Sequence, residues 1–198
     1  MTKDVKNHNT NTLDSDIGYT SKAYGHIHEF YLSGEILPAE AYNEWFDIIR
    51  NAGSEDYVKI YINSPGGDLC TAIQFLRVLN ETNATVTTSV EGACMSAATM
   101  IFLSGHRLEV TPHSLFMFHN YSGGAFGKGG EMFEQISFQH KWSEKLFKEV
   151  YQDFLTEEEI QEMMHGRDLW LDCDEVLKRA KRAMAARNKK EETQEEGA

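Results

Sequence analysis

The chain has 198 residues, of which 41% are hydrophobic and 25% charged, as in an ordinary soluble globular protein. Its formal net charge of −12 opposes contact with a phosphate backbone, so we do not expect nucleic-acid binding. No apolar run reaches the roughly 18 residues of a membrane span, and residues 1–16 lack the apolar core of a secretory signal. We therefore expect a soluble, cytoplasmic protein with no membrane partner. Its widely spaced Cys70, Cys94 and Cys173 are expected to be reduced thiols.

The first half of the chain, after a polar segment at 1–24, alternates between two hydrophobic periods. Apolar residues recur at every second position in the strands and at three- and four-residue spacing in the helices. The expected elements are a strand at 28–32, a helix from Pro38 to about 51, a strand at 57–62, a helix at 68–81 and a strand at 84–90. This alternation predicts an α/β fold in which helices cover a largely parallel sheet.

The second half begins with a buried helix near Ser96, followed by short strands at 107–110 and 115–118. A glycine-rich stretch at 122–130 separates these from a long helix at about 131–154. Thr156 and Glu159 form a capping box that opens another helix, and 169–171 is interpreted as an apolar turn. We expect three parts: a mobile arm at 1–24, a folded domain at 25–178 and a charged, fraying tail at 179–198.

Two glycines, Gly66 and Gly67, stand between a strand and a helix. Glycine permits backbone conformations and close approaches that a side chain would block. Amides at such a junction can point at one spot and stabilise an oxyanion. The simpler interpretation is that Asn63 to Gly67 form only a tight turn.

Ser96 opens a helix and is surrounded by small residues. The helix dipole there favours developing negative charge, and the amide of Ala97 is placed to donate to an oxyanion. These features make Ser96 a candidate nucleophile, although a serine at this position can also be a simple N-cap. Cys94 is a rival nucleophile, but a thiol in apolar surroundings is unreactive.

A base and an acid follow further along the chain. His119 ends an apolar strand, where one ring nitrogen can face a nucleophile. Asp168 can orient that histidine, or it can pair with Arg167 as a structural ion pair. No third ligand accompanies the His26 and His28 pair at a recognisable spacing, so we expect no metal and no cofactor.

From about residue 30 to 175 the sequence resembles the Clp protease proteolytic subunit family. The matching stretches are 31–36, 61–67 with its Ile-Asn-Ser-Pro-Gly-Gly string, 92–105, 116–120 and 167–171. The resemblance implies a serine endopeptidase in which Ser96, His119 and Asp168 are the triad. It also implies oxyanion amides at Gly67 and Ala97. Peptide-binding strands are implied at 67–69 and 121–125, which include Asp68, Leu69, Tyr121, Ser122, Gly123 and Gly124.

The same resemblance implies a crotonase-like spiral core with a protruding handle helix at about 131–154. Family members form heptameric rings, paired into a tetradecamer around a closed chamber, and an AAA+ unfoldase feeds this chamber. Lys59 departs from the family, which has a tyrosine of the unfoldase-docking pocket there, and a cation disfavours an apolar loop.

Three further functions remain compatible with the sequence. The stretches around His119 and Trp170 are similar to phage head-maturation proteases of the same fold. The divergent ends of the chain would also suit a catalytically quiet scaffold subunit that partners an active paralogue. Finally, paired oxyanion amides occur in acyl-CoA enzymes of the crotonase type, although we find no place for an adenine nucleotide in this sequence.

Overall fold

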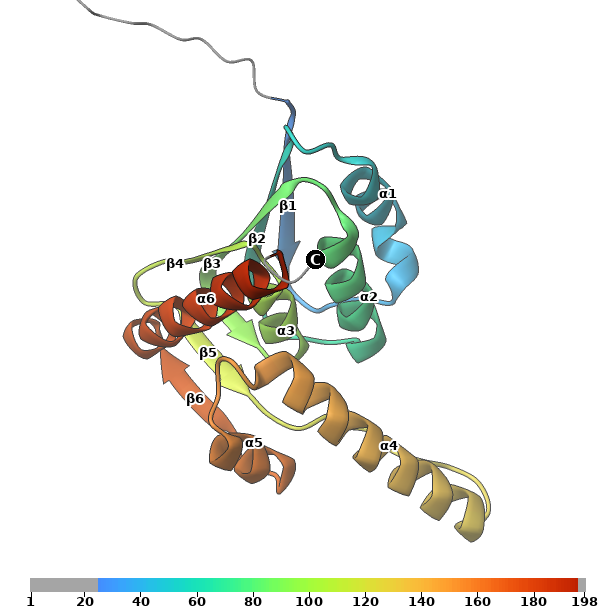
Figure 1. The fold of residues 1–198 in the computed structure, drawn as a ribbon. Helices are drawn as coiled ribbons and strands as arrows, with labels where there is room; N and C mark the ends of the chain where they lie inside the picture. Colours follow the sequence, from blue (N-terminus) through green and yellow to red (C-terminus); the bar gives the residue numbers. More distant parts are fainter. Residues whose placement is uncertain (1–24, 196–198) are drawn as a thin grey trace, which may run out of the picture.

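The computed structural model describes residues 25–195, so the arm expected at 1–24 lies outside the described residues. Within that range, six strands form one sheet in the order β1-β2-β3-β5-β6, and β4 pairs with β3 beside β5 (Figure 1). The strands are β1 (Ile27–Ser33), β2 (Tyr57–Ser64), β3 (Thr85–Met95), β4 (Arg107–Val110), β5 (Leu115–Phe118) and β6 (Leu169–Asp172). The mixed α/β class with a central sheet is confirmed.

The helices cover this sheet and extend beyond it. They are the 3-10 helix η1 (Ala39–Tyr42), α1 (Asn43–Asn51), α2 (Leu69–Glu81), α3 (Ala97–Leu103), α4 (Gly129–Tyr151), α5 (Glu157–Met164) and α6 (Cys173–Glu195). Asp68 caps α2 through its carboxylate, and Thr156 and Glu159 form the expected capping box of α5. The periodic segments of the first half fold as the predicted helices and strands, although β3 continues to Met95, beyond its expected end at residue 90.

Strand β3 joins the two halves of the sheet. All its pairings are parallel: residues 85–90 lie beside β2, residues 87–90 beside β4, and residues 93–95 beside β5. The register between β2 and β3 shifts between Ile62 and Ser64, where the chain turns toward Gly66. This irregularity comes just before Ser96. The end of β3 then pairs with β5, the strand that leads to His119.

The core is a single apolar cluster between the sheet and the helices. Every residue of α3 is buried, as the small side chains of this segment predict. Val58, Ile60 and Ile62 of β2 are completely buried, and their neighbours face outward. A run of buried aromatic contacts joins Phe118 of β5 to Tyr151 and Phe154 near the end of α4. The strand that leads to His119 is thus packed firmly against the core.

Residues 169–171 are a strand, which corrects the interpretation of this segment as a turn. β6 pairs antiparallel with β5, and Phe118 lies opposite Leu169. Four residues are too few to show a clear period, and β6 is the one antiparallel strand among the described residues. This pairing brings the segment around Asp168 to the same edge of the sheet as His119.

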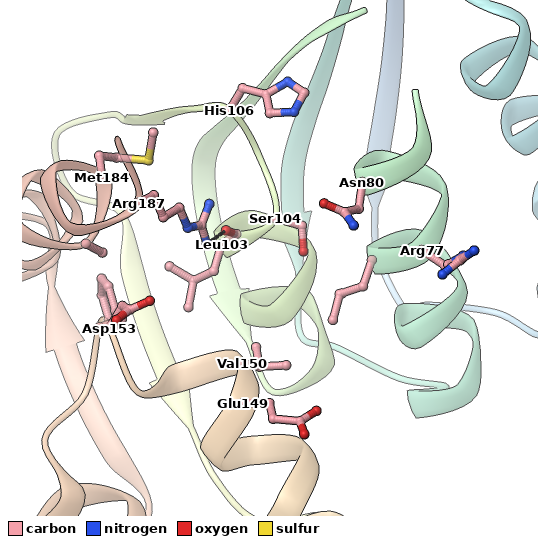
Figure 2. A pocket seen from close by; sticks show the side chains of 13 residues that line it. Arg77, Asn80, Leu103, Ser104, His106, Glu149, Val150, Asp153, Met184 and Arg187 are labelled. Atoms are coloured by element: carbon pink, nitrogen blue, oxygen red, sulfur yellow. Dashed lines mark hydrogen bonds between the residues drawn. The ribbon is translucent and has the colours of Figure 1, made fainter. Parts of the chain in front are cut away.

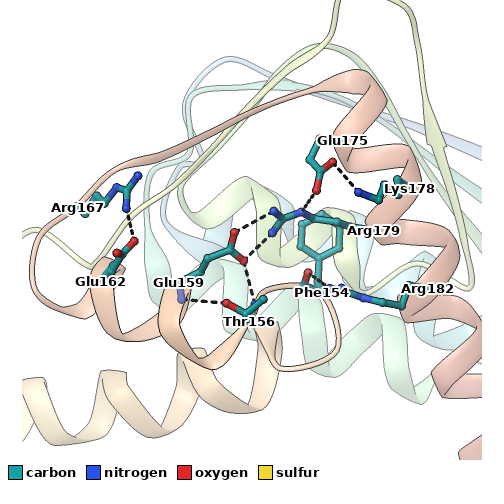
Figure 3. Close-up of polar contacts among 9 residues, drawn as sticks. All are labelled: Phe154, Thr156, Glu159, Glu162, Arg167, Glu175, Lys178, Arg179 and Arg182. Carbon is teal, nitrogen blue, oxygen red and sulfur yellow. Dashed lines mark hydrogen bonds and ion pairs between the residues drawn. The ribbon is translucent and has the colours of Figure 1, made fainter.

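The domain boundary expected at residue 178 falls inside α6, which continues as a helix to Glu195. Ala180 and Ala183 are buried, and Arg179 binds Glu159 of α5 at 2.7 and 2.9 Å and Glu175 at 2.7 Å (Figure 3). Arg182 donates to the carbonyl of Phe154 at 2.8 Å. From sequence, the run of charges indicates a solvated segment. The buried face of α6 is not evident there because it includes alanines, which carry little hydrophobic signal.

Helix α4 extends away from the body, which it meets mainly through its C-terminal turns (Figure 1). It begins at Gly129 and ends at Tyr151, close to the range expected for a handle. Phe147 and Tyr151 are buried, whereas Phe133 is 73% and Phe138 69% exposed. A helix whose outer half carries exposed aromatic side chains is a candidate for contact with another chain.

Candidate active site

Ser96 occupies a strained turn between β3 and α3. Its φ of 54° and ψ of −131° lie where residues other than glycine are rare. Its side chain does not cap α3, which excludes the simple N-cap interpretation. Instead, its Oγ lies 2.6 Å from Nε2 of His119. The strain at Ser96 therefore accompanies a contact with a histidine. Some reactive serines are held on similarly sharp strand-to-helix turns.

His119 reaches Ser96 because β5 lies beside the end of β3. Met95 pairs with Met117, and the amide of Ser96 donates to the carbonyl of Met117 at 2.7 Å. Asn120 donates to the carbonyl of Met164 at 3.1 Å and accepts from the amide of Tyr121 at 2.8 Å, which fixes the chain after the histidine. If Nδ1 carries the ring proton, Nε2 accepts the Ser96 hydroxyl proton, as a general base must.

Asp168 lies next to His119 in strand register, but no hydrogen bond or ion pair joins these two described residues. Extending the antiparallel pairing of Phe118 with Leu169 by one residue sets Asp168 opposite His119. Within residues 25–195, however, the exposed carboxylate of Asp168 forms neither a hydrogen bond nor an ion pair. Arg167 pairs with Glu162 instead, so the expected alternative of an Arg167–Asp168 ion pair is wrong. The structure brings together two of the three expected triad residues.

Gly66 lies against the Ser96 turn and Gly67 lies against Ile36, and a Cβ would clash at both positions. A Cβ on Gly66, where φ is +95°, would lie 2.7 Å from the Cβ of Ser96 and 2.8 Å from the carbonyl oxygen of Met95. A Cβ on Gly67 would lie 2.3 Å from the carbonyl oxygen of Ile36. The tight turn and the close approach are therefore both present.

The backbone holds Gly67 beside Ile36, and Ala97 follows Ser96 as the first residue of α3. The carbonyl of Gly66 and the amide of Asp68 bind Ile36, which holds Gly67 between them. Ala97 is the first residue of α3, so its amide has no acceptor inside the helix. Gly67 and Ala97, whose amides are the expected oxyanion donors, both line the cavity that contains Ser96.

These groups share one cavity of about 320 Å³. Its walls include Ser96, His119 and the two candidate oxyanion residues, Gly67 and Ala97. Four of the expected substrate-binding residues also line it: Asp68, Leu69, Tyr121 and Ser122. Gly123 and Gly124 are exposed and do not line it. Cavity-lining residues that sequence reasoning did not assign to the site are Cys70, Met100, Asn120, Gln139, Trp142, Phe147 and Tyr151. Most come from α4, and their separation from Ser96 along the chain left no local signal.

Cys94 does not compete with Ser96. It is completely buried, and this burial raises the pKa of its thiol well above the ordinary value. A protonated thiol is a poor nucleophile. Across residues 25–195, no three His, Cys, Asp or Glu side chains gather in a way that could hold a metal ion.

A larger cavity of about 740 Å³ lies elsewhere, between α2, α3, α4 and α6. Figure 2 shows Arg77, Glu149 and Arg187 around it. Arg187 reaches the carbonyls of Leu103 and Gly105, so it closes the C-terminal end of α3. Neither Ser96 nor His119 lines this cavity, and its lining includes both arginine and acidic side chains. We assign the chemistry to the smaller cavity.

The comparisons with known proteins identify the family to which this sequence is similar. The model of the family described as Clp protease matches residues 39–179. The chain is 33% identical over 124 residues to an ATP-dependent Clp protease proteolytic subunit of Chlorokybus atmophyticus, covering 60% of this chain and 54% of the relative. The subunit of Mesostigma viride gives 33% over 124 residues, with 60% and 53% covered. That of Ligilactobacillus salivarius gives 33% over 103 residues, with 50% and 51% covered.

The chain thus spans about half the length of the curated relatives it matches. No helix among the described residues is long and apolar enough to cross a membrane.

Proposed function

Because the chain belongs to the Clp protease family, we propose that it is a serine endopeptidase acting through Ser96, His119 and Asp168. The observation that carries the proposal is the 2.6 Å contact between Ser96 Oγ and His119 Nε2. This contact occurs at a strained turn, on the wall of a cavity, and beside two glycines. An ordinary surface serine needs none of these features.

The proposed reaction is acyl transfer. His119 Nε2 takes the Ser96 proton as Oγ bonds to the carbonyl carbon of the substrate peptide. The tetrahedral intermediate collapses, the C–N bond breaks, and His119 gives its proton to the leaving amine. Water then attacks the acyl-enzyme by the same route, which releases the acid and restores Ser96. Each proton taken up by His119 is returned within the cycle.

The amides of Gly67 and Ala97 are the proposed oxyanion donors. Both residues line the cavity beside Ser96, and α3 adds the positive end of a short helix. One such donor typically contributes about 10²–10³ to kcat. The stretches 67–69 and 121–125 are proposed to flank an extended substrate through their backbone. The Asp68 carboxylate already caps α2, so Asp68 would contribute its backbone and not its side chain.

Asp168 is proposed to orient His119 in the active assembly rather than in the isolated subunit. It sits on an exposed segment one residue before β6, and a small movement of this segment would bring the carboxylate to the ring. In this proposal, contact with a neighbouring subunit supplies that movement. Activity and assembly are therefore coupled.

We infer that α4 is the handle through which subunits associate. Its outer half exposes Phe133, Ile136 and Phe138, and Phe126 in the preceding loop is 99% exposed. A soluble protein normally covers apolar side chains that are gathered in this way. Homo-oligomeric rings around a chamber, in one or two layers, are the assembly that the family membership supports.

The surface around Lys59 combines charged groups with the stacked rings of Tyr31 and Tyr61, which bears on the partner that delivers substrate. Lys59 on β2 pairs with Glu109 of β4 at 2.8 Å and lies 4.9 Å from the centre of the Tyr61 ring. Glu29 accepts a hydrogen bond from Tyr61 at 2.7 Å. If an AAA+ unfoldase or a paralogous subunit docks on this face, we propose that it offers polar or charged groups.

The test is size-exclusion chromatography with light scattering, in which every fraction is assayed with a fluorogenic peptide. We expect activity in a peak of many subunits, and none in the matching peak of Ser96→Ala. Wild-type activity in Ser96→Ala would contradict the proposal. An inactive assembly that becomes active only with a paralogue, whether or not Ser96 is present, would instead identify a scaffold subunit.

A further inference from the structure

Two buried hydroxyl groups connect α4 to the nucleophile's turn. Thr99 of α3 is completely buried, and Tyr151, the last residue of α4, is 2% exposed. Their oxygens lie 2.8 Å apart, and Thr99 Oγ1 also lies 2.7 Å from the carbonyl oxygen of Ser96. The proposed reaction assigns no role to either residue. A tyrosine and a threonine so deep in the core are unusual unless their hydroxyls are used.

The direction of the hydrogen bonds follows from the number of protons. A carbonyl oxygen can only accept, so Thr99 donates its single hydroxyl proton to Ser96. Thr99 Oγ1 is then the acceptor in the second bond, and the Tyr151 hydroxyl is the donor. Burial raises the pKa of Tyr151, so its phenol keeps this proton at neutral pH. The relay therefore has one direction, from Tyr151 to Thr99 to the carbonyl of Ser96.

The carbonyl of Ser96 belongs to the same planar peptide unit as the amide of Ala97. In a trans peptide these two bonds point in opposite directions and rotate together. Holding the oxygen toward Thr99 therefore aims the Ala97 N–H the opposite way. The peptide before Ser96 is also held, because its amide donates to Met117 at 2.7 Å. Both peptide units around this strained residue are anchored, which a φ of 54° requires.

We propose that Thr99 and Tyr151 are positioning residues that aim the Ala97 amide at the oxyanion. The inference rests on the proposed function, since an aimed amide has a purpose only if an oxyanion forms there. Neither residue needs to touch the reacting atoms. Tyr151 acts through Thr99, so its removal should do nothing further once the Thr99 hydroxyl is gone.

The test compares Tyr151→Phe, Thr99→Val, Thr99→Ser and the Thr99→Val/Tyr151→Phe double variant in the assembled protein. The chain offers a matched control, because Tyr57 and Thr87 form a second tyrosine–threonine hydroxyl pair on the sheet. Tyr57→Phe removes the same kind of bond away from Ser96. Three quantities are measured for each protein: kcat and KM with a fluorogenic peptide, affinity for a peptide boronate, and the midpoint of thermal unfolding. A boronate bonded to Ser96 places an oxygen where the oxyanion forms.

We expect Thr99→Val to lower kcat about 10–30-fold and Tyr151→Phe about 3–10-fold, with KM changed less than about twofold. Boronate affinity should fall in proportion to kcat. The double variant should match Thr99→Val alone, Thr99→Ser should remain near wild type, and Tyr57→Phe should lose stability at most.

Unchanged kcat and boronate affinity in a folded Tyr151→Phe protein would overturn the inference, as would a loss confined to KM or equal losses in Tyr57→Phe. If Thr99→Val does not fold, Tyr151→Phe decides alone. A wild-type assembly that neither hydrolyses peptide nor binds boronate would overturn the proposed function, and the inference with it. The two failures are therefore distinguishable.

Discussion

The two sides of His119 differ in how firmly the chain holds them. On one side, Ser96 lies 2.6 Å from the ring, between a buried strand and a buried helix, with the peptide units before and after it hydrogen-bonded. On the other side, the exposed Asp168 lies beside His119 in register and, among the described residues, bonds to nothing. The core of the protein thus arranges the proposed nucleophile and base. The proposed acid lies on a surface segment.

Among the variants that compare the Ser96 and Asp168 sides of His119, Gly66→Ala is expected to cause the largest loss of activity. The new Cβ would lie 2.7 Å from that of Ser96, so the turn must move. A displacement of about 1 Å at a reacting group can cost about 10² in rate, and we expect at least that loss in kcat/KM. Gly34→Ala is the control, because Gly34 also has a positive φ, +86°, but open space around it. Equal activity in the two variants would show that the Ser96 turn is not rigid.

A smaller loss is expected from Asp168→Asn, about 10–10²-fold in kcat, because the carboxylate is not bonded to His119 in this structure. Asp174→Asn, an equal charge change in the exposed first turn of α6, should have no effect. Activity should be measured on the assembled protein. A loss as large as that of Ser96→Ala would mean that Asp168 is held as firmly as the nucleophile, and no loss would remove it from the triad.

The segment around Asp168 depends on α5 and α6, which Arg179 joins through Glu159 (Figure 3). Hydrogen bonds from Arg179 lower the pKa of Glu159 below its ordinary value of 4.5. Since the pKa is lower in the folded state, the stabilisation is fully present above about pH 4.5 and is lost as pH falls through the folded pKa. Glu159→Gln should therefore lower stability by about 1–2 kcal/mol at pH 7 and progressively less below about pH 4.5.

Thermal unfolding across about pH 3–7 checks this prediction. Glu162→Gln is the control, because the Glu162–Arg167 pair is exposed and such pairs contribute about 0–1 kcal/mol. If Glu159→Gln lowers stability by the same amount at both ends of this pH range, the ionic explanation is contradicted.

The smallest catalytic effect is expected from Cys94→Ala, on the Ser96 side of His119. The thiol is buried and its pKa is raised, so it takes no part in the reaction. We expect kcat/KM within about twofold of wild type, and a modest loss of stability from the small cavity. Alkylation of the folded wild-type protein, followed by mass mapping, should leave Cys94 unmodified. If Cys94 is modified and activity is lost, Cys94 becomes an alternative candidate for the nucleophile.

The Ser96 side of His119 is also the side that could be predicted from the sequence. Ser96, Gly67 and His119 each lie next to an element with a clear hydrophobic character, so their placement follows from local pattern and family resemblance. The surface side is harder. β6 has only four residues, and α6 resembles a solvated tail because alanines contribute to its buried face. The Thr99–Tyr151 contact spans 52 residues and leaves no trace in any local pattern.

The identity of Ser96 as the nucleophile of an assembled peptidase can be tested by chemical labelling. The experiment treats the active assembly with a fluorophosphonate and maps the modified residue by mass spectrometry. We predict a single modification on Ser96, with loss of activity in proportion to labelling. Modification of another residue, or complete loss of activity with Ser96 unlabelled, would contradict the assignment.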